Sequence, residues 1–226
     1  MLFRSGEFVG RILYVDTANK IKTSIITILA SIGQLVITIS AGCICLVIYL
    51  GNMIESAWLY VPLAGILLLL SAGIVFLFVY FPYLGDRLSS LVIFQKFSEY
   101  ISVLNLYRPK LFLKVLMLSL LRYLVFTHQY FLLQKLFFPP TPYTETMLLI
   151  SVIYLALAVI PTFALSEIGV RSSVAMFYLG SVISSPVSIT LATLSIWIIN
   201  IAVPSLVGSV LFLAVKFGNG KNNTAA

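Results

Sequence analysis

Two short stretches of the sequence carry an acidic and a basic side chain at the same spacing. Glu7 precedes Arg11 by four residues, and Glu167 precedes Arg171 by four residues. In both stretches a small residue comes before the glutamate and a glycine lies between the two charges. Residues four apart lie on one face of a helix, so each pair can form an ion pair. A glutamate in a first turn also suits the positive end of the helix dipole.

These pairs have two interpretations. A Glu and an Arg at this spacing are common on solvated helices, and one recurrence in the chain is compatible with chance. However, the second pair lies between apolar runs, where charges are costly and usually functional. A guanidinium matches phosphate oxygens in a bidentate fork, so Arg11 and Arg171 are candidates for binding an anionic headgroup. Glu7 and Glu167 would hold these arginines when the site is empty, or would contact an amine of the lipid.

A third arginine, Arg122, lies within residues 111–138, which carry more polar side chains than the other apolar runs. It is a candidate headgroup ligand facing a polar cavity, or it is paired for structural reasons. Arg122 and Gln129 share one face of the expected helix. His128 points away from this face, and we interpret it as a residue that hydrogen-bonds to a neighbouring helix. A neighbouring stripe holds Tyr123, Thr127, Tyr130 and Gln134. The secondary candidates for the binding site are Tyr123, Gln129, Ser166 and Gly169.

The composition places the chain in a membrane. Hydrophobic residues make up 61% of the 226 residues and charged residues 9%, whereas soluble domains carry about 25% charged residues. We therefore expect a single membrane domain over residues 1–226. No segment is polar enough for an appended soluble catalytic domain. The net charge of +7 comes from basic residues scattered between the apolar runs, which favours contact with anionic lipids over nucleic acid binding.

The sequence predicts neither a metal site nor a cofactor, and no catalytic constellation. His128 is the single histidine, which excludes a multi-histidine metal site. Cys43 and Cys45 lie two residues apart in an apolar run, so we interpret them as small buried residues rather than as a disulfide or metal ligands.

The expected fold is all-α, a polytopic transmembrane helix bundle. A span needs about 20 apolar residues, and the runs of suitable composition are 21–50, 58–83, 111–138, 147–163 and 187–215. Gly85 and Asp86 are expected to end the second span, and Pro161 to break the fourth. Residues 51–55 hold no basic residue and are placed on the outer side.

Three further segments complete the expected architecture. Residues 86–109 are predicted to form an amphipathic helix at the cytoplasmic interface. Residues 1–20 form a short charged element, and residues 166–183, with Ser166 as N-cap, form a broken or re-entrant helix. Such interrupted segments persist at membrane depth only where they are buried in protein or line a cavity. Two of them in separate halves of a chain are typical of a transporter binding site.

Parts of the sequence resemble flippase-like membrane proteins related to the transmembrane region of lysylphosphatidylglycerol synthase. Residues 5–11 (SGEFVGR) and 16–20 (DTANK) resemble the early Gly-Glu motif of that family. Residues 160–171 (IPTFALSEIGVR) are similar to its late motif of a proline followed by Gly-x-Arg, and residues 122–130 lie where such proteins carry a polar, aromatic span.

The sequence departs from the family's pattern in two ways. The late motif usually places an acid directly after the arginine, whereas this chain has Ser172 there and carries its acid at Glu167. The family also has spans before the Gly-Glu motif, and these are missing here. We therefore expect the chain to be an N-terminally shortened member.

The resemblance implies that the chain moves a phospholipid or a lipid-linked headgroup between leaflets, with membrane lipids as its partners, in a bacterial cytoplasmic (inner) membrane. Lysine transfer is not implied, because the transferase domain of the synthases is absent. One alternative is a non-catalytic scaffold that binds a membrane protein partner or forms a homo-oligomer. Another is a membrane-embedded lipid-modifying enzyme using Ser166, Ser172 and Glu167, although no histidine or second carboxylate is close in sequence to assist them.

Overall fold

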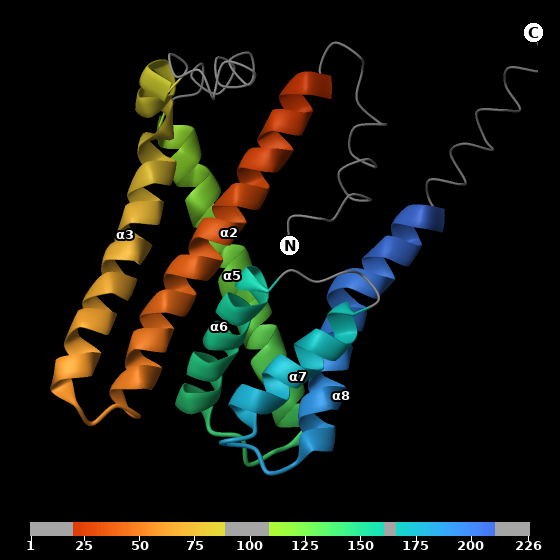
Figure 1. The fold of residues 1–226 in the computed structure, drawn as a ribbon. Coiled ribbons are helices and arrows are strands. Elements are labelled where there is room, and N and C mark those ends of the chain that lie inside the picture. The colour runs from red at the N-terminus through yellow and green to blue at the C-terminus, as the bar shows by residue number, and fades with distance from the viewer. Residues whose placement is uncertain (1–19, 89–108, 161–165, 211–226) are drawn as a thin grey trace, which may run out of the picture.

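A computed structural model of the chain describes residues 20–88, 109–160 and 166–210. All regular elements in these ranges are helices (Figure 1). They are α2 (Lys20–Gly51), α3 (Ala57–Leu88), α5 (Pro109–Phe137), α6 (Tyr143–Val159), α7 (Glu167–Leu179), α8 (Pro186–Trp197) and the π-helix η3 (Ile198–Ala202), after which the helix continues to residue 210. The predicted element at 1–20 and most of the predicted interfacial helix at 86–109 lie outside the described residues.

Within the described residues, four helices are long and apolar enough to cross a membrane, and they confirm that the chain is an integral membrane protein. They are Ile26–Gly51, Ala57–Phe81, Lys110–Phe137 and Pro186–Val210. The remaining predicted span, 147–163, is instead α6, which starts at Tyr143 and has 17 residues. At 1.5 Å per residue α6 is about 26 Å long and the 13-residue α7 about 20 Å. Both are shorter than the hydrocarbon core of about 30 Å.

The short helices α6 and α7 form a pair that does not run the length of the bundle. Figure 1 shows α6 starting at the end of the bundle where α2 and α3 are joined, and α7 returning to that same end before α8 begins there. The Tyr154 hydroxyl near the end of α6 donates a hydrogen bond of 3.3 Å to the carbonyl of Phe126, which lies midway along α5. The end of α6 therefore lies beside the middle of α5.

Prolines and their neighbours explain the ends of the short helices. Ile160 adopts an extended conformation (φ −78°, ψ 115°) because the residue before a proline is disfavoured in the helical region, and residue 161 is proline. At the start of α8, Ser185 is the N-cap, its side chain accepts a hydrogen bond from the Ser188 amide, and Pro186 takes the first helical position. Gly85 and Asp86 were expected to end the second span, and the apolar span does end before them, at Phe81. The helix α3 continues through both to Leu88, since one glycine costs a helix only about 1 kcal/mol.

Glycines of α2 set how closely it packs against its neighbours. A Cβ added at Gly42 would lie 2.5 Å from the Cβ of Leu155 on α6, and one at Gly33 would lie 2.7 Å from Val115 on α5. Small residues of this kind let membrane helices approach closely.

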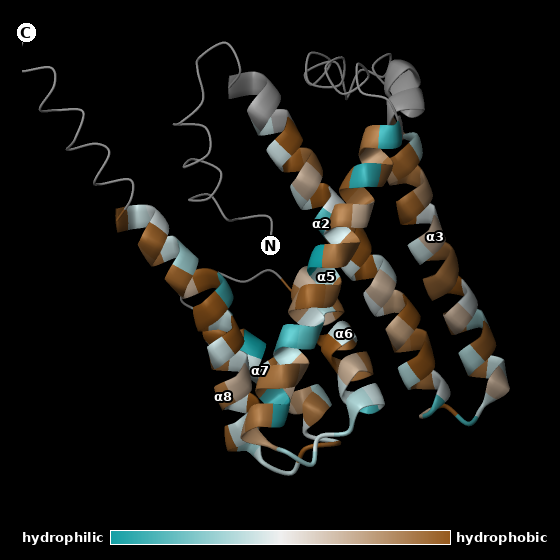
Figure 2. Cartoon of the chain, turned by 180° about the vertical axis from the view of Figure 1, so that it is seen from behind, coloured by the Kyte–Doolittle hydropathy of each residue, from teal (hydrophilic) through white to brown (hydrophobic). Residues whose placement is uncertain are grey.

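The outward faces of the helices are apolar. Large side chains such as Trp58, Leu69 and Phe76 on α3 are exposed. Figure 2 shows hydrophobic residues dominating α2 and α3, while hydrophilic residues recur along α5 and on α7. This distribution fits lipid around α3 and places the polar chemistry on α5 and the short helices.

The α2–α6 contact gives a stability prediction. Gly42→Ala should lower the free energy of unfolding by about 1–3 kcal/mol, because the new methyl group meets a Cβ and a backbone carbonyl that cannot move independently of their helix. Thermal unfolding of the purified protein in detergent measures this. Gly65→Ala on α3 is the matched control, since its Cβ would meet nothing within 4 Å. Equal melting temperatures for the two variants would contradict the packing account.

Candidate functional site

The ion pair predicted from the Glu167 and Arg171 spacing is present. The Nη2 and Nε groups of Arg171 donate hydrogen bonds of 2.6 Å and 3.0 Å, and both end on the same oxygen, Oε1 of Glu167. The side chains of Arg171 and Glu167 are 14% and 23% exposed. The pair is therefore largely withdrawn into the bundle, where an unpartnered charge would be costly.

The start of α7 positions this pair. Glu167 is the first residue of the helix, so its carboxylate lies at the positive end of the helix dipole. Ser166 occupies the N-cap position as predicted, but its side chain makes no capping hydrogen bond. Gly169 is exposed, and a Cβ there would meet nothing within 4 Å. This glycine is therefore not needed for helix packing.

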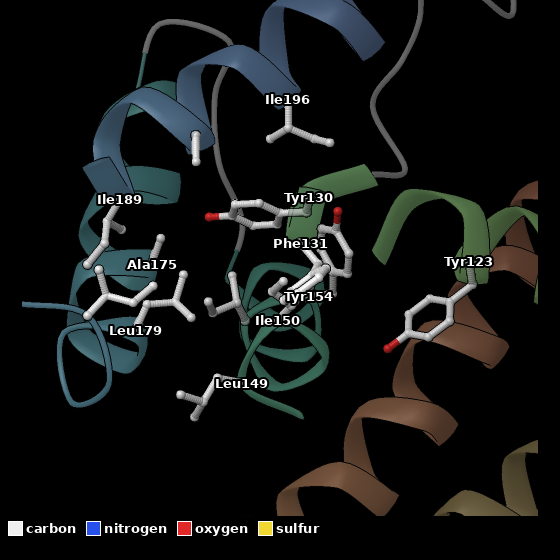
Figure 3. Close-up of a cluster of buried hydrophobic side chains, with 13 residues drawn as sticks. Tyr123, Tyr130, Phe131, Leu149, Ile150, Tyr154, Ala175, Leu179, Ile189 and Ile196 are labelled. Carbon is white, nitrogen blue, oxygen red and sulfur yellow. The ribbon is translucent and has the colours of Figure 1, made fainter. Parts of the chain in front are cut away.

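Two buried tyrosines lie near the pair. Tyr130 of α5 and Tyr154 of α6 are within electrostatic range of Arg171, and their ring centroids are 6.2 Å apart. Tyr130 points from α5 towards α8 (Figure 3), where its hydroxyl lies 2.6 Å from Oγ1 of Thr193. Because the Thr193 hydroxyl donates to the Ile189 carbonyl, Tyr130 is the donor to Thr193. We call Tyr130, Tyr154, Glu167, Arg171 and Thr193 the polar layer.

A second polar contact joins α5 to the π-helix. Nδ2 of Asn200 donates a hydrogen bond of 3.0 Å to Oε1 of Gln129. The π-turn comes just before Pro204, which has no amide hydrogen and whose ring would clash with the carbonyl four residues earlier in an ordinary helix. Widening the helix accommodates the proline, and such π-turns are frequent at functional sites. The sequence marked Gln129 but missed Asn200 as its partner, although a polar residue four positions before a proline in an apolar span was the available signal.

The predicted stripe along α5 is confirmed, because Tyr123, Thr127, Tyr130 and Gln134 are all buried. Arg122 lies outside it. Its side chain is exposed, with the guanidinium carbon 5.1 Å from the centroid of the Phe126 ring. The structure therefore does not place Arg122 in the polar layer with Arg171, and its predicted role as a headgroup ligand stays a prediction.

The contacts of His128 confirm that it forms a hydrogen bond to a neighbouring helix. Its Nδ1 lies 2.9 Å from the carbonyl oxygen of Leu124, and its Nε2 lies 3.0 Å from the hydroxyl of Tyr143 on α6. A carbonyl only accepts, so Nδ1 carries a hydrogen. In the neutral ring Nε2 then accepts from Tyr143.

The described residues also bear on metal binding, on the two cysteines and on nucleophilic catalysis. Among them no group of three or more His, Cys, Asp or Glu side chains could hold a metal ion, and Cys43 and Cys45 are free thiols, with Cys43 buried. Oγ of Ser172 is buried and has no hydrogen-bond partner in this part of the chain, so no base there activates it as a nucleophile.

The first Glu/Arg stretch is not placed, since Glu7 and Arg11 lie outside the described residues. The predicted approach of the two stretches stays a prediction. Comparison of the chain with protein-family models, curated proteins and solved structures finds no match.

The contact between α5 and the π-helix can be tested by a double-mutant cycle. Gln129→Leu and Asn200→Leu should each destabilise the protein, and their combination should be less than additive by about 0.6 kcal/mol, the average measured for interhelical hydrogen bonds in a membrane protein, and by at most about 1.7 kcal/mol. Denaturant unfolding in mixed micelles measures the coupling. Gln129→Leu combined with Ser31→Ala, whose hydroxyl bonds only within α2, should be additive. Full additivity of the first pair would show that this hydrogen bond does not stabilise the protein.

Proposed function

We propose that this chain moves a phospholipid or lipid-linked headgroup between the leaflets of a bacterial cytoplasmic membrane and that Arg171 binds the phosphate of that headgroup. One observation carries the proposal. The Glu167–Arg171 pair is largely buried, and it starts a helix too short to cross the bilayer. Charges placed in such a position are expected to mark a substrate pathway.

The position of α6 and α7 supports this. The end of α6 lies beside Phe126 of α5 and beside Gly42 of α2, both well inside helices that are long enough to span. In a bilayer the two short helices would then enter and leave on one side, as a re-entrant pair with Glu167 and Arg171 near its tip. Interrupted helices that end at mid-depth are typical of transporter binding sites.

The charge distribution favours entry of this pair from the outer side. The connections 52–56, 138–142 and 180–185 lie at one end of the bundle (Figure 1) and contain no lysine or arginine, although Lys135 lies close by. The opposite ends of α2, α3 and α5 are flanked by Lys20, Lys22, Arg87, Arg108, Lys110 and Lys114. By the positive-inside rule the second end is cytoplasmic, so α8 returns the chain to the cytoplasmic side.

The geometry of the ion pair suits an exchange of anions. Both hydrogen bonds from Arg171 end on Oε1 of Glu167, so the carboxylate does not engage the guanidinium as a two-oxygen fork. A phosphate can accept one hydrogen bond on each of two oxygens from the same guanidinium. Breaking a buried pair without a replacement costs about 3–5 kcal/mol. Exchanging Glu167 for a lipid phosphate keeps the arginine paired throughout, and returning to Glu167 releases the lipid.

Transport can be tested in reconstituted vesicles that contain a fluorescent phosphatidylglycerol. Arg171→Ala should slow its movement between leaflets at least tenfold, towards the rate of protein-free vesicles, because the phosphate loses its cation. Reduction of the outer-leaflet fluorophore by dithionite gives the rate. Lys135→Ala, which removes an exposed cation at the end of α5, is the control and should keep the wild-type rate. If folded Arg171→Ala protein moves lipid as fast as wild type, the transport proposal is lost.

The exchange step predicts a different outcome for the glutamate. Glu167→Gln removes the competing carboxylate, so the affinity for an anionic lipid should rise about tenfold, equivalent to 1.4 kcal/mol, while transport slows because release is no longer assisted. Lipid titration of the purified variant, monitored by native mass spectrometry, measures the affinity. Unchanged affinity would mean that Glu167 does not compete with the headgroup.

A further inference from the structure

The helix that begins as α8 changes its surroundings at the π-helix η3. Before η3, the residues that α8 buries in the bundle are Ser188, Ile189, Ala192, Thr193 and Ile196. Within η3 no residue is buried, and every residue from 203 to 210 is exposed. Figure 1 shows this last part of the helix leaving the bundle. We call residues 203–210 the distal segment.

The backbone loses a hydrogen bond at the same place. The amide of Val203 donates to the carbonyl of Ile198, which is five residues earlier rather than four. Pro204 comes next, and it has no amide hydrogen to donate to the preceding turn. The connection between α8 and the distal segment is therefore weakened where side-chain packing also ends. Prolines and π-turns are the usual sites at which helices bend.

One side-chain contact holds η3 to α5. Ser188 donates a hydrogen bond to the Phe137 carbonyl near the start of α8, and Asn200 donates to Gln129 in η3. Residue numbers fall along α5 as they rise along α8, so the two helices run antiparallel. Among the contacts between side chains of the described residues, Asn200–Gln129 is the one that lies beside the distal segment.

The helix α5 is held along its length by two hydrophobic cores. Tyr130 and Phe131 belong to one buried cluster, which they share with residues of α6, α7 and α8. Phe112 and Leu116 belong to a second cluster, which they share with residues of α2 and α3. The distal segment contributes to neither cluster. Bending at η3 would therefore displace the distal segment and leave α5 in place.

The surfaces that bending would bring together are exposed. Leu118 and Val125 share a face of α5 with Gln129, and both are exposed. In the antiparallel register of the Gln129–Asn200 contact, Val210 lies nearly opposite Leu118, and it is also exposed. Lipid tails are as apolar as these side chains, so no hydrophobic driving force fixes the distal segment against α5.

We infer that η3 is a hinge about which the distal segment swings towards and away from α5, and that the Asn200–Gln129 hydrogen bond limits the outward swing. This inference does not depend on the proposed function. Arg122 lies between Leu118 and Val125 on the same face of α5. An inward swing brings the distal segment over this charge, and an outward swing exposes it, so the hinge controls access to Arg122.

Double electron–electron resonance between two spin labels measures the movement. Labels at Leu118→Cys and Val210→Cys, in full-length protein that carries Cys43→Ala and Cys45→Ala and is reconstituted in lipid nanodiscs, report the distance from α5 to the end of the distal segment. At 1.5 Å per residue this segment is about 12 Å long, so a swing of about 25° moves its end by about 5 Å. The distance distribution should be broader by about that amount than the distribution for a control pair, Leu118→Cys with Leu191→Cys, whose second label lies on α8 before the hinge.

Two substitutions test the parts assigned to Asn200 and Pro204. Asn200→Leu releases η3 from α5, so the mean distance between Leu118 and Val210 should increase by about 5 Å. Pro204→Ala restores the missing amide hydrogen, so the distribution should become as narrow as that of the control pair. The control pair should keep its distance in both variants, which also shows that the packed part of α8 remains folded.

The outcomes are distinct from those of the transport experiment. A distribution for Leu118 and Val210 that is as narrow as the control overturns the hinge, and so does a broad distribution that neither substitution changes. A response to only one substitution keeps the hinge and removes the role assigned to the other residue. Loss of the transport proposal in vesicles would leave each of these results unchanged.

Discussion

A charge in an apolar bundle must keep a partner, and this requirement links the features around Arg171. Glu167 supplies the partner through two short hydrogen bonds. The N-terminal turn of α7 places both charges on one face, and the ending of α6 after Val159 puts that turn among the long helices rather than at their ends. Any anion that takes the place of Glu167 must satisfy the same requirement, which is why a lipid phosphate is the proposed ligand.

The uncharged polar groups obey a weaker form of the same rule. Thr38, Thr127 and Ser151 donate to carbonyls of their own helices, and Gln129 and Tyr130 find partners on α8 and its π-turn. The contacts of Gln129 and Tyr130 join α5 to α8 and its π-turn. Among the described residues, buried polar side-chain atoms without a hydrogen-bond partner occur at Tyr123, Gln134, Thr146, Ser172 and Trp197.

Much of the framework could be predicted from the sequence, because it depends on local rules. Run length identified the four long spans, Pro161 marked the end of α6, and the four-residue spacing gave the Glu167–Arg171 pair. Hydropathy could not show that α6 starts and α7 ends at the same end of the bundle. A short apolar run has the same hydropathy whether its helix crosses the membrane or returns to the side it came from. The Asn200–Gln129 bond and the Gly42–Leu155 contact depend on how distant helices pack, which no local pattern encodes.

The central claim is that the guanidinium of Arg171 contacts a lipid phosphate inside the membrane. Solid-state nuclear magnetic resonance in bilayers can detect dipolar coupling between ¹⁵N-labelled arginine side chains and lipid ³¹P. The account predicts a coupling in the wild-type protein that is missing from the Arg171→Lys variant, so that the difference reports this one residue. Identical couplings in the two proteins would show that Arg171 does not bind the headgroup and would contradict the account.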